Sequence, residues 1–394
     1  MAAMLRTLAV AGYRSLRSVV VPLAPLTVIS GANGTGKSSL YRALRLLAEC
    51  GQGQVIGSLA REGGLSSALW AGPESLQAAR RGAPVQGTVR KGPVAVQLGF
   101  GSDEFGYLVD LGLPQQRKTL FTRDPEIKRE LVFSGPVMRP ATTLVRRKRS
   151  VVEVRDDDGW SQLSRDLPSY RSVLAEYADP HATPELSEVR EQIRSWRFHD
   201  GFRVDAHAPA RQMHVGTRTP VLADDGADLA AAVQTIIEEG WGDLEAVVAD
   251  AFDGATLGVG EYDGALDLRL QQRGMLRPLR AAELSDGTLR FIMWATALLT
   301  IDPPPLLVLN EPETSLHPDL LGPLASLVTA AATHGQVIVV SHSRPFIDRL
   351  DAVPLDETEG DEPAVEIELV KDLSETMVSG QGLLTRPPWE WGSR

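Results

Sequence analysis

The 394-residue sequence contains a single cysteine, Cys50, which excludes an internal disulfide and a metal cluster held by cysteines. No apolar stretch is long enough to span a bilayer, and Met1–Val10 lacks the charged-then-apolar order of a signal peptide. No heptad pattern is sustained, so we expect no long coiled-coil arm. These absences favour a cytoplasmic protein with no membrane partner, in which Cys50 packs within a helix.

An excess of basic residues is also missing, because 40 Lys and Arg face 51 Asp and Glu, for a net charge of −11. This balance argues against a surface coated with basic groups, although nucleic-acid binding needs only a local stripe. The run Arg146–Arg149 is one candidate stripe. Such a run is more often a solvated loop or a hairpin flank, and Asp156–Asp158 offsets its charge, so both interpretations stay open.

What the sequence does contain is a complete G-x-x-x-x-G-K-[S/T] loop at Gly31–Ser38, between the apolar run Leu26–Ile29 and the helix-like stretch Ser38–Ala48. Glycines let backbone N–H groups turn toward a phosphate, and the following helix presents its positive end to the same anion. We expect Lys37 to reach the β- and γ-phosphates of ATP and the Ser38 hydroxyl to bind Mg²⁺. The other expected nucleotide contacts in this loop are Asn33, Gly34, Thr35, Gly36 and Ser39.

A second apolar run, Leu306–Leu309, ends in Asn310 and Glu311. A buried parallel strand would deliver these polar groups to the mouth of the phosphate site, which is the Walker B position. Glu311 is the residue we expect to polarise the attacking water. Taken alone, such a glutamate is more often a helix cap or a loop residue, and the phosphate loop makes the catalytic interpretation the stronger one.

Two further segments could contact a phosphate. Ser285 and Gly287 precede the apolar helix Leu289–Leu299 and would form a second anion-binding helix terminus, although plain N-capping is the simpler interpretation. His342 follows the apolar run Val337–Val340 and could donate a hydrogen bond to the γ-phosphate, although a lone histidine is more often structural.

The order of these four segments resembles that of ABC-type ATPases, and Gly12–Leu16 with Asn310–Pro318 is similar to the RecF/SMC-like branch, specifically its small RecF-type AAA family ATPases. The resemblance implies an ATP-driven head-to-tail homodimer. In that dimer Ser285 and Gly287 of one subunit would complete the site that Lys37, Ser38 and Glu311 build in the other.

The resemblance implies further roles. Ser315–His317 falls at the dimer-communicating D-loop, and Arg14 falls where relatives carry a basic residue near the nucleotide. Gln97, on a strand-like segment, is the best candidate for the glutamine that senses Mg²⁺. Asn310 stands where the family has an aspartate that orients Mg²⁺, and a neutral amide contributes no charge. We therefore predict weaker metal affinity and slow hydrolysis.

The expected fold class is α/β, an ABC-type P-loop head with a mixed or parallel sheet, an antiparallel β subdomain and an inserted, mainly helical lobe. The predicted divisions are 1–110 for the first part of the head, 111–220 for the lobe, 221–378 for the second part of the head and 379–394 for a tail. The tail is expected to be either weakly structured or partner-binding.

The leading functional hypothesis is an ATPase that dimerises on ATP and acts in DNA repair, DNA maintenance or defence against foreign DNA, with double-stranded DNA as a possible partner. The alternative is a nucleotide-sensing module that controls a separate effector protein with slow or no hydrolysis. An ATPase subunit of a membrane transporter ranks lower, because the Asn310–Pro318 segment fits the RecF-like branch better. Arg211 could contact phosphate or form a loop ion pair.

Overall fold

The structure is a computed structural model that describes residues 3–82, 84, 95–114, 124–352, 363–382 and 384–392. Its contacts divide the chain into two units. The first unit comprises Met1–Ala24, Ile29–Trp196 and Val365–Arg394, and the second unit comprises Pro25–Val28 and Arg197–Ala364. Each unit is described by itself.

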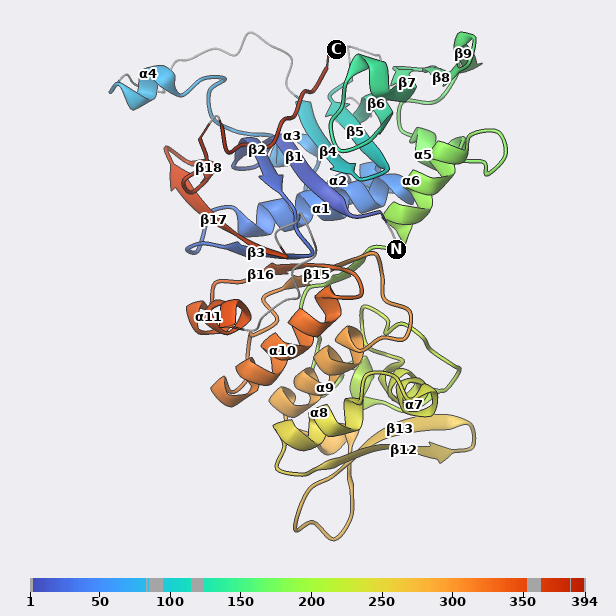
Figure 1. Cartoon of the computed structure of the whole chain (residues 1–394), viewed down its shortest axis with the longest axis vertical. Helices are drawn as coiled ribbons and strands as arrows, with labels where there is room; N and C mark the ends of the chain where they lie inside the picture. Colours follow the sequence, from blue (N-terminus) through green and yellow to red (C-terminus); the bar gives the residue numbers. More distant parts are fainter. Residues whose placement is uncertain are drawn as a thin grey trace. The chain divides into compact units, whose positions relative to one another are not determined.

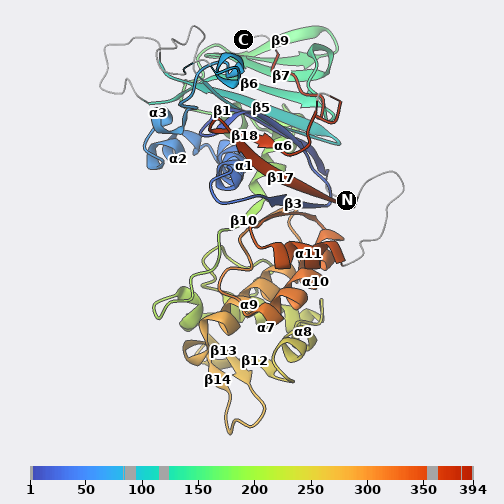
Figure 2. The same ribbon diagram turned by 90° about the vertical axis from the view of Figure 1, so that its left-hand side faces the viewer.

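The first unit is built on an antiparallel sheet with the strand order β2-β1-β4-β5-β6-β7-β8-β9. Helices α1 and α6 pack against each other and against one face of this sheet (Figure 2). The apolar positions of α1 form its buried side. The strands are β1 (Leu5–Tyr13), β2 (Leu16–Pro22), β4 (Ala95–Ser102), β5 (Phe105–Gly112), β6 (Glu126–Ser134), β7 (Thr143–Lys148), β8 (Val151–Asp156) and β9 (Gly159–Ser164), and the helices are α1 (Lys37–Gly51), α2 (Val55–Arg61), α3 (Leu65–Ala68), α4 (Gln77–Arg80), α5 (Val173–Glu176) and α6 (Pro184–Arg194).

The residues on either side of the turn at Gly12–Ser15 form the antiparallel pair β1 and β2. The predicted division at 111–220 differs from the observed one. Strand β6 pairs with β5, so residues 126–164 extend the sheet that begins at the N-terminus, and residues from Arg197 onward belong to the second unit. Sequence periodicity does not show which strands pair, and here the pairing sets the boundary.

The basic run Arg146–Arg149 lies on β7 and at its turn to β8. Arg147 is fully buried, pairs with the equally buried Glu130 at 2.7 Å and donates to Pro168 O at 2.8 Å. Arg146 pairs with Glu153 and lies over the Trp160 ring at 4.0 Å. The run is therefore the flank of a hairpin, and Arg147 is not available to nucleic acid.

The described part of the tail packs against this sheet. Trp389 and Trp391 contact an apolar cluster that includes Leu131 and Phe133, and Arg129 Nη2 donates to Trp391 O at 2.5 Å. A Cβ at Gly99 would lie 2.5 Å from the Trp389 ring, so the absence of a side chain there makes room for the tryptophan. Sequence composition alone did not decide between the two interpretations of the tail.

The first unit also contains the terminal hairpin of β17 (Ala364–Asp372) and β18 (Glu375–Val378). Strand β3 (Leu26–Ser30), which leads into the phosphate loop, is divided between the units: Leu26–Val28 belong to the second and Ile29 and Ser30 to the first. In the first unit, Ser30 Oγ donates to Glu366 on β17 at 2.7 Å.

The second unit contains the parallel strands β10 (Arg197–His199), β15 (Leu306–Asn310) and β16 (Gln336–Val340), with β15 in the middle. Helix α9 packs against α7, α8 and α10 (Figure 1). Buried residues of these helices, among them Phe291 and Trp294 of α9, form one apolar core. This alternation of buried strands and helices is the predicted parallel arrangement. The helices are α7 (Leu229–Glu239), α8 (Leu244–Ala251), α9 (Asp286–Leu298), α10 (Leu321–Ala332) and α11 (Arg344–Ala352), and a smaller antiparallel sheet holds β11 (His214–Val215), β12 (Thr256–Tyr262), β13 (Ala265–Gln271) and β14 (Leu279–Arg280). Across the described residues, no helix combines the length and apolarity needed to cross a membrane.

Candidate nucleotide site

The phosphate loop has the strand–loop–helix context that the sequence predicts, because it joins β3 to α1. Gly31, Gly34 and Gly36 all have positive φ angles, and a Cβ at Gly36 would lie 2.3 Å from Thr376 Oγ1. A side chain at position 36 would therefore clash with β18 as well as strain the backbone. Glycine is required here by both geometry and packing.

Lys37 begins α1, and its buried ammonium donates to Gly31 O at 2.6 Å and to Ala32 O at 3.1 Å. The cation thus lies over the loop. Among the described residues, the backbone N–H groups of Asn33, Gly34 and Ser38 donate no hydrogen bond. Unpaired amides, a lysine and a helix N-terminus together fit a polyphosphate anion.

The other loop residues have distinct positions. Thr35 is buried, and its hydroxyl donates to Ala32 O at 2.8 Å, so it stabilises the loop turn. Ser38 is exposed and Ser39 is half-buried on the first turn of α1. An exposed hydroxyl on Ser38 fits an oxygen ligand for Mg²⁺.

Thr376 on β18 contacts the phosphate loop, and no sequence motif points to this residue. Its hydroxyl lies 2.6 Å from Thr35 O and 2.8 Å from Ser15 Oγ, and its backbone N–H donates to Ser15 O at 2.9 Å. These contacts join residues more than 340 positions apart in the chain, which explains why spacing could not reveal them.

Arg14 has a left-handed φ of 49° in the turn between β1 and β2. Its guanidinium donates to Glu62 Oε2 at 2.7 Å and to Tyr13 Oη at 3.2 Å. Burial works to lower the pKa of Arg14, but these bonds and charges raise it overall. In this structure the residue expected near the nucleotide is therefore engaged by Glu62.

Gln97 lies on β4, where its amide donates to Asp110 Oδ1 at 2.8 Å. Asp110 is also paired with the buried Arg129 at 3.2 Å. The Gln97 side chain is thus part of a polar network within the antiparallel sheet, and the structure gives it no link to the other expected metal ligands.

In the second unit, Glu311 follows β15 directly and has a left-handed φ of 51°. Its backbone N–H donates to Val340 O at 2.7 Å, so the end of β15 stays attached to β16. His342 follows β16, and its Nδ1 lies 3.3 Å from Glu311 Oε1. The adjacent parallel strands β15 and β16 thus bring together Glu311, the expected base, and His342, the expected donor to the γ-phosphate. The left-handed φ of Glu311 is a strained backbone conformation of the kind found at functional sites.

Glu313 is a buried carboxylate beside this pair that sequence reasoning did not single out. Ser341 Oγ donates to its Oε1 at 2.6 Å, and His342 Nδ1 lies 3.9 Å from the same atom. Its other oxygen, Oε2, is buried with no hydrogen-bond partner among the described residues. In the sequence, its position two residues after Glu311 was the only sign that pointed to Glu313 as part of the site.

Asn310 ends β15, and its Nδ2 lies 3.5 Å from Asp200 Oδ1. Asp200 directly follows β10, which pairs in parallel with β15 so that His199 is opposite Leu309. A carboxylate therefore lies beside the neutral amide at the carboxyl edge of the sheet. Sequence reasoning missed Asp200, because β10 has only three residues and its neighbour is more than 100 positions away.

Ser285 is the N-cap of α9, and its hydroxyl accepts the N–H of Thr288 at 3.2 Å. This is the simple capping role. Ser285 is also exposed, and a Cβ at Gly287 would lie 3.6 Å from Ser315 O. The segment Leu284–Gly287, called the signature segment below, therefore lies beside the D-loop segment Ser315–His317. Arg290 on α9 strengthens this contact by donating to Thr314 O at 3.0 Å.

Arg211 holds the segment before α9. Its buried side chain pairs with Asp286 at 2.6 Å and donates to the carbonyl oxygens of Leu284 at 2.8 Å and Ala281 at 3.0 Å. Of the two interpretations of Arg211, a phosphate contact and a loop ion pair, the structure shows the ion pair. Arg211 also fixes the shape of the segment that carries Ser285 and Gly287.

The phosphate loop of the first unit, and Glu311 and the signature segment of the second, carry the motifs by which the sequence resembles ABC-type ATPases of the RecF/SMC-like branch. The chain belongs to the family described as "AAA domain, putative AbiEii toxin, Type IV TA system", whose model matches residues 26–349. No curated protein matches the sequence.

Solved structures with similarity to this chain include SMC heads. The SMC head domain from Thermotoga maritima has 14% identity and a TM-score of 0.44, over 95% of this chain and 98% of that one. An SMC head bound to the C-terminal winged-helix domain of ScpA has 14% identity and a TM-score of 0.48, over 96% and 98%. An SMC head with an extended coiled coil, bound to the C-terminal domain of ScpA derived from Pyrococcus furiosus, has 12% identity and a TM-score of 0.49, over 95% and 96%.

Proposed function

We propose that this protein binds ATP with Mg²⁺, hydrolyses it slowly and forms a homodimer when ATP is bound. The observation that carries the proposal is the Glu311–His342 pair at the ends of adjacent parallel strands in a chain of an ATPase family. In this proposal the phosphates are held by Lys37 and by the N–H groups of the loop.

Each remaining residue has a role in the proposed reaction. Glu311 accepts a proton from the attacking water. His342 lies beside that carboxylate, with Nδ1 3.3 Å from Glu311 Oε1, and its other ring nitrogen, Nε2, is the donor that we assign to the γ-phosphate. Ser285 and Gly287 act on the nucleotide of the partner subunit in the dimer. Mg²⁺ would neutralise the developing phosphate charge when bound.

In the second unit, oxygens of Asn310 and Asp200 are the Mg²⁺ ligands that we propose, and in the phosphate loop the Ser38 hydroxyl stays the expected ligand; such oxygens suit a hard cation. Asp200 replaces Gln97 in this set, because Gln97 is engaged by Asp110 whereas Asp200 contacts Asn310. The Asp200 carboxylate supplies the negative charge that Asn310 lacks.

The biological role that we propose is defence against foreign DNA or maintenance of DNA in the cytoplasm. The family description, which names a putative toxin of a type IV toxin–antitoxin system, supports a defence role. A second candidate is a nucleotide sensor that controls an effector protein. The two candidates differ in how far Asp200 offsets the neutral Asn310, since incomplete compensation would weaken metal binding, slow hydrolysis and prolong the ATP-bound state.

The test is Mg²⁺-dependent ATP hydrolysis by the purified protein, with and without double-stranded DNA, alongside Lys37→Ala and Glu311→Gln. We expect turnover that both substitutions reduce at least about 100-fold, with ATP binding retained in Glu311→Gln. Stimulation by DNA supports the DNA-linked role. Binding without turnover, with an ATP-dependent partner captured from the host, supports the sensor, and the absence of ATP binding contradicts both.

A further inference from the structure

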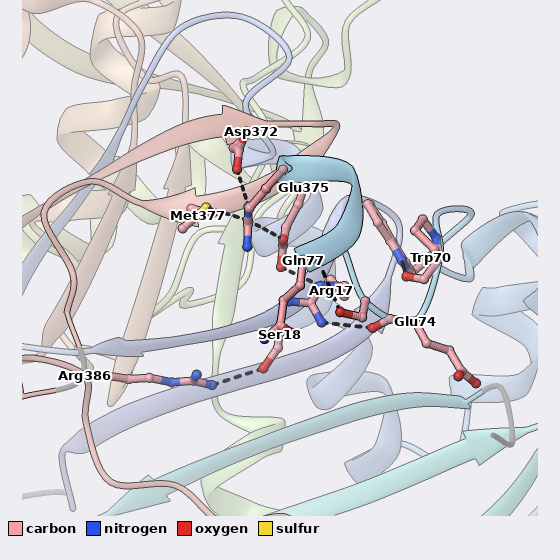
Figure 3. Close-up of polar contacts among 12 residues, drawn as sticks. Arg17, Ser18, Trp70, Glu74, Gln77, Asp372, Glu375, Met377 and Arg386 are labelled. Carbon is pink, nitrogen blue, oxygen red and sulfur yellow. Dashed lines mark hydrogen bonds and ion pairs between the residues drawn. The ribbon is translucent and has the colours of Figure 1, made fainter. Parts of the chain in front are cut away.

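The first unit contains a polar pocket of about 450 Å³ that the nucleotide site does not use. Strands β2 and β18 and the residues Gln381 and Gly382 form its walls, and α4 and the tail contribute one arginine each. Figure 3 shows how several of these side chains converge. The polar side chains that line the pocket include those of Arg17, Ser18, Arg80, Glu375 and Arg386.

A single buried carboxylate fixes two of the three arginines. Glu375, whose side chain is only 5% exposed, accepts from Arg17 Nε at 2.7 Å and from Arg80 Nη2 at 3.0 Å. Arg80 also pairs with Asp372 at 2.7 Å. Each guanidinium is thereby held in one orientation, so binding a ligand would cost little side-chain entropy.

Arg386 is different, because its charge has no carboxylate partner among the described residues. Within the described residues, the one hydrogen bond of its guanidinium runs from Nη2 to Ser18 Oγ, at 3.1 Å (Figure 3). Nη2 of Arg17 and Nη1 of Arg80 likewise have no acceptor within the described part of the chain. Three guanidinium groups therefore face two carboxylates, Glu375 and Asp372, which leaves an excess of one positive charge and several unused N–H donors.

We propose that this pocket binds a phosphate group, taken either from a nucleic-acid backbone or from a small phosphorylated molecule. Planar guanidinium groups match the spacing of phosphate oxygens, and the volume lies within the usual range for ligand pockets. The site is distinct from the phosphate loop and does not depend on the proposed ATPase activity.

The experiment uses the full chain with Lys37→Ala, so that the phosphate loop contributes little binding. Affinity for inorganic phosphate is measured by calorimetry, and affinity for a short labelled DNA duplex by fluorescence anisotropy at one fixed salt concentration. Arg386→Gln and Arg386→Lys are compared with Arg155→Gln. Arg155 is a matched control because it is exposed in the same unit and donates to a neutral oxygen, Ala141 O, at 2.7 Å.

We expect Arg386→Gln to weaken inorganic phosphate binding about tenfold, Arg386→Lys to restore part of the affinity, and Arg155→Gln to change it less than twofold. A parallel loss of duplex binding identifies nucleic acid as the source of the phosphate, and unchanged duplex affinity identifies a small molecule. The proposal is overturned if inorganic phosphate does not bind, or if Arg386→Gln and Arg155→Gln behave alike. Because no ATP is present, failure here leaves the ATPase proposal intact.

Discussion

Asn310 and Asp200 lie beside each other at the carboxyl ends of two paired parallel strands, with Nδ2 and Oδ1 3.5 Å apart. The amide stands where the resemblance leads us to expect a carboxylate, and the neighbouring strand provides one. The metal affinity of the site should therefore depend on Asp200, although the sequence motif points only to Asn310.

Asp200→Asn should weaken Mg²⁺ binding about tenfold, because it removes the remaining charge of the pair. Asn310→Asp should strengthen it. Both effects can be measured as Mn²⁺ binding by electron paramagnetic resonance with a non-hydrolysable ATP analogue, so that the result does not depend on turnover. Asp205→Asn is the control, since Asp205 is an exposed carboxylate nearby in sequence that pairs with Arg203. Equal metal affinity in Asp200→Asn and the parent protein would contradict the proposal that the Asp200 charge compensates for the neutral Asn310.

Arg211→Ala should weaken ATP-dependent dimerisation at least about tenfold and leave ATP binding to the monomer within about twofold. The reason is that Arg211 shapes the segment carrying Ser285 and Gly287 but does not belong to the phosphate loop. Analytical ultracentrifugation with ATP in the Glu311→Gln background measures the first quantity, and calorimetry measures the second. Arg203→Ala, which breaks an exposed ion pair near Arg211 in the sequence, should change neither. Parallel losses of both quantities would indicate general misfolding instead.

Thr376→Val should lower ATP affinity about fivefold, because the substitution keeps the shape of the side chain and removes a hydroxyl that supports Thr35 O. Thr143→Val is the matched control: it also removes a buried hydroxyl that donates to a carbonyl, that of Arg139 at 3.0 Å, but on another strand of the same unit. The two variants should lose similar stability, as measured by thermal unfolding. Only Thr376→Val should lose nucleotide affinity, and a similar ATP affinity in both variants would rule out this support of the loop.

Cys50 should react with thiol reagents only when the protein unfolds. It is fully buried in α1, its Sγ lies 3.3 Å from Leu46 O, and burial raises the pKa of its thiol. Labelling with iodoacetamide at pH 8, followed by mass spectrometry, should show modification in denaturant and almost none without it. Rapid labelling of the native protein would show that α1 opens locally.

The sequence predicted features that depend on local order. The phosphate loop between a strand and a helix, the strand ending at Asn310 and the capped start of α9 all follow from short motifs and periodicity, and the structure confirms these elements. Their functional roles remain predictions. Gln97 is a residue whose role could not be predicted from local order. Whether it can bind a metal depends on which strand ends lie beside one another, and in the structure its amide donates to Asp110.

The partners of Arg211, Thr376 and Arg147 were not predictable for the same reason. Arg211 meets the signature segment from about 70 residues away, and Thr376 meets the phosphate loop across almost the whole chain. The basic run around Arg147 suggests exposed charges, but strand pairing places Arg147 against the buried Glu130. In each case a long-range contact, rather than local composition, sets the environment.

Strand β18 connects the two anion sites that we propose in the first unit. Side chains of successive strand residues point to opposite faces, and here Glu375 bonds to the arginines of the pocket while Thr376, the next residue, bonds to the phosphate loop. The two contacts are one peptide apart on the same strand. A phosphate that shifts β18 when it binds the arginines would therefore shift the Thr376 contact as well. Occupancy of one site would then change the affinity of the other, and by the same factor in the reverse direction.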